Sequence, residues 1–401
     1  MHESMTLLWI VLVILGYGYF SRLLARLNIS GPMVFVTVGI LLSPLGFGSE
    51  PVHLQTEAVK IVAEIALIII LFSDASGIDM RRLKEERTLP FRLLFVALPM
   101  TILTAAGAAG LFFPDEEALY WLLIALVLAP TDAALGKAVV TDTRLPERIR
   151  NTINVESGLN DGIVFPLFIT VVTMIALGEG GEGWALYLTK QILLGAIAGA
   201  IVGRAGAWLS RTAASRGWMA HQYANLIPVA LAIFSYYLAE FFGGNGFIAA
   251  YLAGFFAGNY DATVRRGVEE FAESEGEFLV MLSFLVFGLA FVPVTVEYWS
   301  NPAVWGYALL SLTLFRMFPA WLALAGTSTD GVTRLFLGWF GPRGIASILY
   351  VLIAVERIGD ISGHERLFGV ISLTIFLSIF LHGFSASPLT VWYASYLQKR
   401  R

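Results

Sequence analysis

The sequence contains no cysteine and few charged residues. The absence of cysteine among its 401 residues excludes disulfides, iron–sulfur clusters and thiol catalysis. Charged residues make up 14% of the chain, compared with roughly 25% in soluble domains. The net charge of -4 argues against nucleic acid as a partner. We interpret the five histidines as loop residues, because they follow no metal-ligand spacing (His2, His53, His221, His364 and His382).

Long apolar runs dominate the chain instead. Hydrophobic residues make up 57% of it, and the mean hydropathy is +0.74. A helix needs about 20 predominantly apolar residues to span a bilayer. Such runs recur thirteen times, with centres near residues 15, 38, 67, 101, 126, 163, 196, 232, 252, 285, 314, 343 and 380. The sequence therefore predicts an all-α polytopic protein with about 13 transmembrane helices in the lipid bilayer.

The basic residues are distributed unevenly between the loops. If successive loops alternate sides, 20 of the 26 basic residues fall on one side. Loops rich in Lys and Arg stay in the cytoplasm. We therefore expect a cell-membrane protein with the N-terminus outside and the C-terminus in the cytoplasm, as an odd number of helices requires.

An internal repeat relates the two halves of the chain. LVLAPTDAAL at 126–135 aligns with GWFGPRGIAS at 338–347, and AEIALIIILF from residue 63 aligns with GEFLVMLSFL from residue 276. The displacement of seven helices is odd and inverts the second copy, as in many secondary transporters. We predict one transporter domain, 1–401, with six-helix repeats at 1–177 and 223–401 and a connecting helix 7 within 178–222.

Two prolines should break helices 5 and 12 in the membrane. Pro130 and Pro342 occupy equivalent positions in the repeat, and proline removes a helical hydrogen bond. Thr131 and Asp132 lie at the first break and Arg343 at the second. Because half-helix ends carry opposite partial charges, Asp132 and Arg343 have suitable signs to offset them. We expect these crossed broken helices to form the functional centre.

Three acids lie in segments that are otherwise apolar. Asp132, Glu156 and Asp161 fall within thirty residues of one another. Placing a charge in the hydrocarbon core costs about 2.5–3.5 kcal/mol on insertion scales, so such acids usually mark an ion or proton path. The accompanying polar residues Thr131, Ser157 and Asn160 add oxygen atoms. Asp161, Asp132, Ser157 and Thr131 can together surround a monovalent cation, and burial favours the protonated form of a carboxylate.

Four motifs resemble one transporter family. NVESGLNDG (154–162), APTDAA, FGPRGIAS and GGNGFIAAYLAGFFAGN (243–259) are similar to signatures of the electroneutral NhaP and NHE branch of the monovalent cation/proton antiporters. The resemblance covers essentially the whole chain. It implies a 13-helix fold with a mobile six-helix core bundle and a dimerisation domain, and hence a homodimer.

The resemblance also implies roles for individual residues. Asp161 would be the shared carrier of cation and proton. Asp132, Thr131 and Ser157 would be further ligands of the Na+ ion. Glu156 would form a structural ion pair with Arg316 on helix 11, and Arg343 is the alternative partner. Asn160 would occupy the place of a second aspartate in the electrogenic branch.

Two features depart from the family pattern. Helix 3 ends in LFSDASGIDM, with Asp74 and Asp79 where fewer acids are expected. Asp74 is therefore a candidate to contribute near the inner entrance. The sequence ends at Arg401, so we expect it to lack the long cytosolic regulatory domain of many relatives.

These observations predict a secondary antiporter rather than an enzyme. We expect 1:1, electroneutral exchange of Na+, or else Li+ or K+, for H+, without any cofactor. One alternative is an intramembrane aspartyl protease using Asp132 and Asp161, but the sequence lacks its G-x-G-D motif and the scheme leaves Glu156 and Asn160 without a purpose. A passive cation channel is a further alternative, which the inverted pair of broken helices disfavours. Gly195, Gly199 and Gly203 form a small-residue stripe that we expect to pack within the molecule.

Overall fold

The computed structural model describes residues 2–48, 57–80, 87–132, 135–178, 184–260, 262–271, 276–359 and 363–400. Within these ranges all regular secondary structure is helical. A helix pairs its own backbone groups, which an apolar surrounding requires. Seven of the helical stretches are long and apolar enough to span a membrane, and α2, α7 and α12 are shorter apolar helices.

The first half of the chain runs from α1 to α9. Its helices are α1 (His2–Arg26), α2 (Gly31–Leu42), α3 (Glu57–Ser76), α5 (Thr88–Arg92), the π-helical η1 (Leu93–Ala97), α6 (Leu98–Phe112), α7 (Ala118–Val127), α8 (Lys137–Val140) and α9 (Glu147–Leu177).

The second half runs from α10 to α21. Its helices are α10 (Trp184–Ser215), α11 (His221–Ala224), α12 (Leu226–Phe241), α13 (Gly246–Tyr260), α14 (Ala262–Phe271), α15 (Glu277–Val286), the π-helical η3 (Phe287–Phe291), α16 (Val292–Thr295), the 3-10 helix η4 (Val296–Ser300), α17 (Pro302–Leu312), α18 (Leu314–Ala323), α19 (Gly331–Trp339), α20 (Ile345–Ile358) and α21 (Glu365–Gln398).

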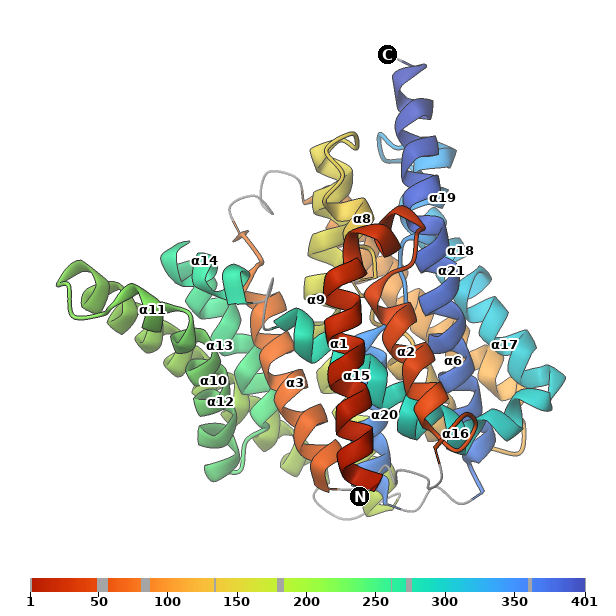
Figure 1. Ribbon diagram of the computed structural model, residues 1–401, viewed down its shortest axis with the longest axis horizontal. Helices are drawn as coiled ribbons and strands as arrows, with labels where there is room; N and C mark the ends of the chain where they lie inside the picture. Colours follow the sequence, from red (N-terminus) through yellow and green to blue (C-terminus); the bar gives the residue numbers. More distant parts are fainter. Residues whose placement is uncertain are drawn as a thin grey trace.

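The thirteen predicted segments match these helices. Twelve of their centres lie inside a helix, and the centre near residue 343 lies between α19 and α20. The two chain ends lie at opposite ends of the molecule (Figure 1). Helix α10 lies within 178–222, and the division into two repeats with a connecting helix stays a prediction.

Both predicted helix breaks are present. After α7 ends at Val127, the described residues of 128–136 are non-helical until α8 begins at Lys137. Residues 340–344 are likewise non-helical between α19 and α20. These segments, here named the α7/α8 break and the α19/α20 break, contain Pro130 and Pro342. The expectation of two proline-interrupted helices is confirmed.

The small-residue stripe of α10 packs within the molecule, as predicted. Helix α10 lies against α13, beside α12 and α14 (Figure 1). A Cβ atom added at Gly199 or Gly203 would lie 2.3 Å from the backbone oxygen of Ala249 or Ala253 in α13, and one added at Gly195 would lie 2.5 Å from the backbone oxygen of Asn245, just before α13. The absence of side chains therefore allows the backbones of these two helices to approach each other.

Helix α19 begins at a capped loop outside the membrane-spanning segments. The Asp330 carboxylate accepts a hydrogen bond of 2.9 Å from the backbone N–H of Thr333 and bonds to Tyr396 and Arg400 of the C-terminal region. Partial burial by itself would raise the pKa of Asp330. The hydrogen bonds from Thr333 and Tyr396 and the charge of Arg400 lower the pKa by more, so that the net result is a pKa of about 2 instead of 3.8. This cap connects the start of α19 to the end of α21.

The interpretation of the histidines as loop residues is confirmed for His364 and wrong for three others. His364 directly precedes α21, whereas His2 and His221 are the first residues of α1 and α11. His53 lies outside the described residues.

His382 is not a loop residue but lies in the middle of α21, where it is 1% exposed. Its Nε2 lies 3.0 Å from the Trp339 oxygen of α19 and its Nδ1 lies 3.1 Å from the Ser378 hydroxyl of α21, which explains how a polar ring is accommodated in the interior.

Candidate ion-binding site

Helix α9 supplies four polar side chains to one buried region. Glu156, Ser157, Asn160 and Asp161 are each at most 5% exposed. Residues four apart lie on the same face of a helix, and the intervening positions lie one step around it. The NVESGLND segment therefore presents two carboxylates, an amide and a hydroxyl to the neighbouring helices.

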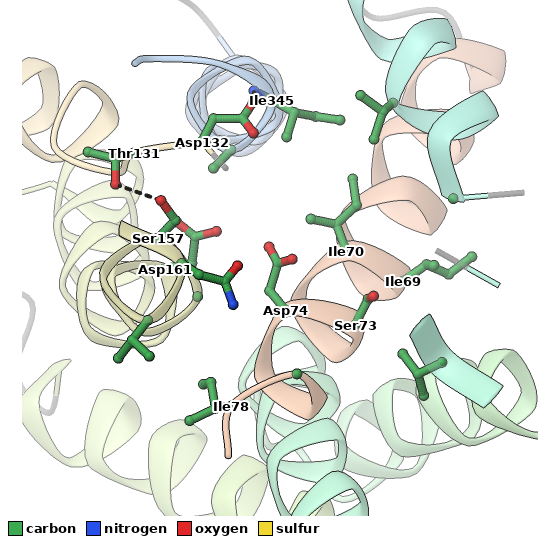
Figure 2. Close-up of a pocket in the computed structure, with 18 residues that line it drawn as sticks. Ile69, Ile70, Ser73, Asp74, Ile78, Thr131, Asp132, Ser157, Asp161 and Ile345 are labelled. Carbon is green, nitrogen blue, oxygen red and sulfur yellow. Dashed lines mark hydrogen bonds between the residues drawn. The ribbon is translucent and has the colours of Figure 1, made fainter. Parts of the chain in front are cut away.

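The α7/α8 break lies directly against this face of α9. The hydroxyl oxygens of Thr131 and Ser157 are 3.2 Å apart (Figure 2). The side-chain amide of Asn160 donates a hydrogen bond of 2.6 Å to Thr131 Oγ1. Asn160 therefore has a positioning role, because it holds the first break in place against α9.

The two breaks contact each other. The backbone N–H of Asp132 donates to the Pro342 oxygen at 2.9 Å. The Asp132 carboxylate in turn accepts a hydrogen bond of 2.8 Å from the N–H of Ile345, the first residue of α20. A negative charge is favourable at a helix N-terminus, so Asp132 offsets the positive end of α20.

Arg343 lies at the C-terminal end of a helix, where the partial charge is negative. Its Nη1 donates to the Ala129 oxygen at 3.1 Å, just beyond the C-terminus of α7, and bonds of 3.4 and 3.2 Å reach the oxygens of Pro130 and Gly341. The positive guanidinium therefore offsets the negative end of α7. Each charged residue compensates the end of the other interrupted helix.

A glycine permits this crossing. A Cβ atom added at Gly344 would lie 1.9 Å from the Asp132 carboxylate. Only a residue without a side chain allows the backbone of the α19/α20 break to approach Asp132 so closely. The close contact with Asp132 therefore explains why the second glycine of FGPRGIAS, Gly344, carries no side chain.

A cavity of about 320 Å³ connects α3, α9 and the two breaks. Asp132, Asp161, Thr131 and Ser157 line it, and so does Asp74. Figure 2 shows Asp74 projecting from α3 toward the side chains of α9 and the α7/α8 break. The cavity extends to residues 77–78, 268 and 276, which adjoin the loops rich in basic residues.

Asp74 lines the cavity itself, whereas the sequence predicted for it only a role near the inner entrance. The sequence indicated Asp74 because it is an acid in an apolar run, but the sequence does not show that α3 brings it into the same cavity as Asp161. Asp79, the other acid of this segment, forms an ion pair of 3.0 Å with Arg265 of α14 and is not among the cavity-lining residues.

Asp161 has an oxygen that is open to a ligand. Within the described part of the chain, Oδ1 of Asp161 is buried and has no hydrogen-bond partner. The carboxylates line the cavity without forming a tight cluster: among the described residues, no group of three or more His, Cys, Asp or Glu is arranged to hold a metal ion.

Buried aromatic rings lie beyond Asp161. Tyr350 is stacked on Phe168 with ring centroids 4.6 Å apart and makes an edge contact with Phe165 at 5.4 Å. The Tyr350 hydroxyl donates to the backbone oxygen of Asp161 at 3.3 Å. All three rings are at most 2% exposed, so closely packed apolar groups occupy this side of the site.

Glu156 is paired with a buried arginine. Arg316 Nη2 lies 2.5 Å from Glu156 Oε1, and the two side chains are 2% and 4% exposed. Arg316 belongs to α18, which begins just after helix 11 is interrupted at Thr313. Of the two partners considered, Arg316 is the one that forms the ion pair, while Arg343 binds backbone oxygens.

A family model and several known proteins match the chain. The model for the transmembrane region of sodium/hydrogen exchangers matches residues 10–392. The K(+)/H(+) antiporter NhaP of Alkalimonas amylolytica is 25% identical over 96% of the chain and 67% of that protein. The K(+)/H(+) antiporter NhaP2 of Shewanella oneidensis is 26% identical over 91% of the chain and 63% of that protein. The chain therefore spans about two thirds of the length of these bacterial relatives.

Similarity extends to a yeast protein and to a solved structure. The Na(+)/H(+) antiporter of Schizosaccharomyces pombe is 26% identical over 88% of the chain and 81% of that protein. The structure of the sodium proton antiporter MjNhaP1 from Methanocaldococcus jannaschii at pH 8 superimposes with a TM-score of 0.75, covering 98% of this chain and 99% of that one. At 18% sequence identity this likeness shows a shared fold.

Proposed function

The chain belongs to the sodium/hydrogen exchanger family, and from this premise we propose that it is a membrane antiporter that exchanges a monovalent cation for H+. Na+, K+ and Li+ are the candidate cations. The relatives it matches bear the names of transporters and not of enzymes, which argues against an intramembrane protease.

The observation that carries the proposal is the composition of the cavity. Asp161 presents an unpartnered carboxylate oxygen to a space that Asp74, Asp132, Thr131 and Ser157 also line. Carboxylate and hydroxyl oxygens are suitable ligands for a hard cation. A carboxylate can instead take up a proton, so one site can serve both substrates in turn.

We infer that Asp161 is the shared carrier. With either a proton or a cation bound, Asp161 carries no net charge, and the site can change its side of access. With neither bound, an anion would have to cross an apolar barrier. Exchange is therefore obligatory. Packed rings on one side of Asp161 and a cavity on the other support alternating access in the state described.

The electrostatic partners of the other charged groups support a 1:1, electroneutral cycle. Asp132 is compensated by the N-terminus of α20, and Glu156 by Arg316. Asn160 carries no charge that could change. Asp74 lies in the same cavity and therefore has to keep one protonation state through the cycle if each turnover moves one cation against one proton.

We further propose the orientation and assembly of the protein. The N-terminus would lie outside and the C-terminus in the cytoplasm, so that the cavity faces the cytoplasm. The protein would work as a homodimer in the cell membrane, as the family resemblance implies. Termini at opposite ends of the molecule support an odd number of crossings (Figure 1).

Proteoliposomes provide the test. An imposed Na+ or K+ gradient should move protons in the opposite direction, and dequenching of a pH-sensitive dye across Li+, Na+, K+ and Rb+ should identify the cation. Clamping the membrane potential with valinomycin should leave a Na+-driven flux unchanged, with a control for K+ as a substrate. Cation flux without proton movement would indicate a channel. A flux that scales with potential would disprove 1:1 exchange and indicate Asp74 as a second proton carrier.

A further inference from the structure

The α19/α20 break exposes backbone groups that a continuous helix would have paired. Buried N–H and C=O groups need hydrogen-bond partners, above all where water is excluded. Two side chains of α21 provide them. His382 Nε2 lies 3.0 Å from the backbone oxygen of Trp339, the last residue of α19. The backbone N–H of Arg343 donates to Ser378 Oγ at 2.6 Å, at the other end of the break.

These contacts form one continuous chain of hydrogen bonds. The Trp339 oxygen can only accept, so His382 Nε2 carries the proton and donates it. A neutral imidazole then has an unprotonated Nδ1, which lies 3.1 Å from both Ser378 Oγ and the Ser378 backbone oxygen. Of these two groups only the hydroxyl can donate to Nδ1. The Ser378 hydroxyl accepts from Arg343 and donates to His382. Every group in the chain is satisfied when the imidazole is neutral with its proton on Nε2, an assignment made from the partners.

Ser378 and His382 are both buried next to the break. Ser378 and His382 are four residues apart on one face of α21 and are 0% and 1% exposed. The His382 ring also packs on Trp339, with ring centroids 4.8 Å apart. Because both side chains are buried, removal of either one leaves a backbone group of the break without its partner.

The α19/α20 break in turn fixes Asp132. The oxygen of Pro342 accepts from the Asp132 N–H, and the N–H of Ile345 donates to the Asp132 carboxylate. Both contacts come from backbone within three residues of Arg343. A shift of the break therefore moves the Asp132 carboxylate relative to the cavity, although neither His382 nor Ser378 is among the cavity-lining residues.

We propose that His382 and Ser378 are positioning residues for transport, which hold the α19/α20 break so that Asp132 is correctly placed at the cation cavity. They contact neither the cation nor the proton. This inference rests on the antiport function proposed above, and it assigns a transport role to α21, whose histidine has no part in the carrier mechanism.

The test compares apparent KM for the cation with maximal rate in proteoliposomes. Ser378→Ala and His382→Ala should each raise KM about tenfold, because one buried hydrogen bond to the break is lost, with a smaller change in maximal rate. His382→Gln keeps a donor near the Trp339 oxygen, and His382→Asn keeps an acceptor near Ser378. Each should recover part of the lost affinity. If His382→Ala does not fold, Ser378→Ala, which removes one atom, tests the same claim.

Ser385→Ala is the matched control. Ser385 lies about one turn beyond His382 on α21, but its hydroxyl accepts from the Trp339 side chain at 3.0 Å and not from the backbone of the break. Its loss should leave KM unchanged. Variants with lowered thermal stability but wild-type KM would overturn the positioning role, as would an equal effect of Ser385→Ala. Absence of exchange by the wild-type chain would instead refute the proposed function.

Discussion

Removing one partner of the buried Glu156–Arg316 pair should strongly destabilise the protein. The two atoms are 2.5 Å apart and the side chains are 4% and 2% exposed, so solvent screens their attraction little. Truncating one member of such a pair typically costs about 3–5 kcal/mol, because the other charge stays buried. Glu156→Gln should be the more harmful change. It removes the carboxylate that interacts with both Arg316 and Arg343, two positive charges that also act on each other.

The assay is unfolding of purified variants in detergent, arranged as a double-mutant cycle. Glu156→Gln and Arg316→Gln should each lower the free energy of unfolding by about 3 kcal/mol or more. The double variant should lose less than the sum of the two, by about 0.5–3 kcal/mol, because contacting residues are coupled. Gln is close in size to both residues, so the change tests charge more than volume.

The control is the same substitution at an exposed pair. Glu277 lies 2.9 Å from Lys137, and these side chains are 38% and 57% exposed. Because water screens such pairs, Glu277→Gln should cost no more than about 1 kcal/mol. Simple additivity of the two buried substitutions would refute the direct pairing. Equal costs at Glu156 and Glu277 would refute the argument from burial.

Three further predictions concern the carrier, the topology and the response to acid. Asp161→Asn should abolish exchange in liposomes while leaving the fold intact, because an amide neither takes up a proton nor neutralises a cation; residual exchange above a tenth of wild type would contradict a single carrier. A reporter fused after Arg401 should be active only in the cytoplasm, since 20 of 26 basic residues fall on that side; activity outside would mean that the helix count is wrong by one. The pKa of Asp330 is about 2 in the folded protein, below its ordinary 3.8. Its stabilising contribution should therefore be present above pH 4 and be lost as the pH falls toward 2, and Asp330→Asn should flatten that part of the thermal-stability profile.

Much of the fold could be predicted because it depends on local properties of the chain. Apolar runs of spanning length located the helices, and Pro130 and Pro342 located the breaks. A proline disrupts a helix whatever surrounds it, so both breaks follow from sequence. The loop assignment of His382 was wrong for the opposite reason. A polar ring in an apolar run gives no indication of whether a neighbouring helix offers it a partner.

The candidate site could be predicted only in part. The spacing on α9 placed Glu156, Asn160 and Asp161 together, because helical periodicity alone brings residues four apart to one face. The amide of Asn160 nevertheless bonds to Thr131, a contact that no spacing within α9 could indicate. Asp74 lines the same cavity from α3, although it precedes Asp161 by nearly ninety residues in the sequence, and no local spacing could predict that proximity.

The sequence by itself determined that this is a polytopic membrane chain, where its helices break, and which charges accompany the breaks. Tertiary structure alone decided how those charges are used. Asp132 meets the N-terminus of α20 and Arg343 meets the C-terminus of α7, over 200 residues away in each case. The reason is physical. Helix formation and bilayer insertion depend on neighbours along the chain, whereas contacts between distant residues depend on how the helices cross and pack, and only the folded molecule sets those crossings.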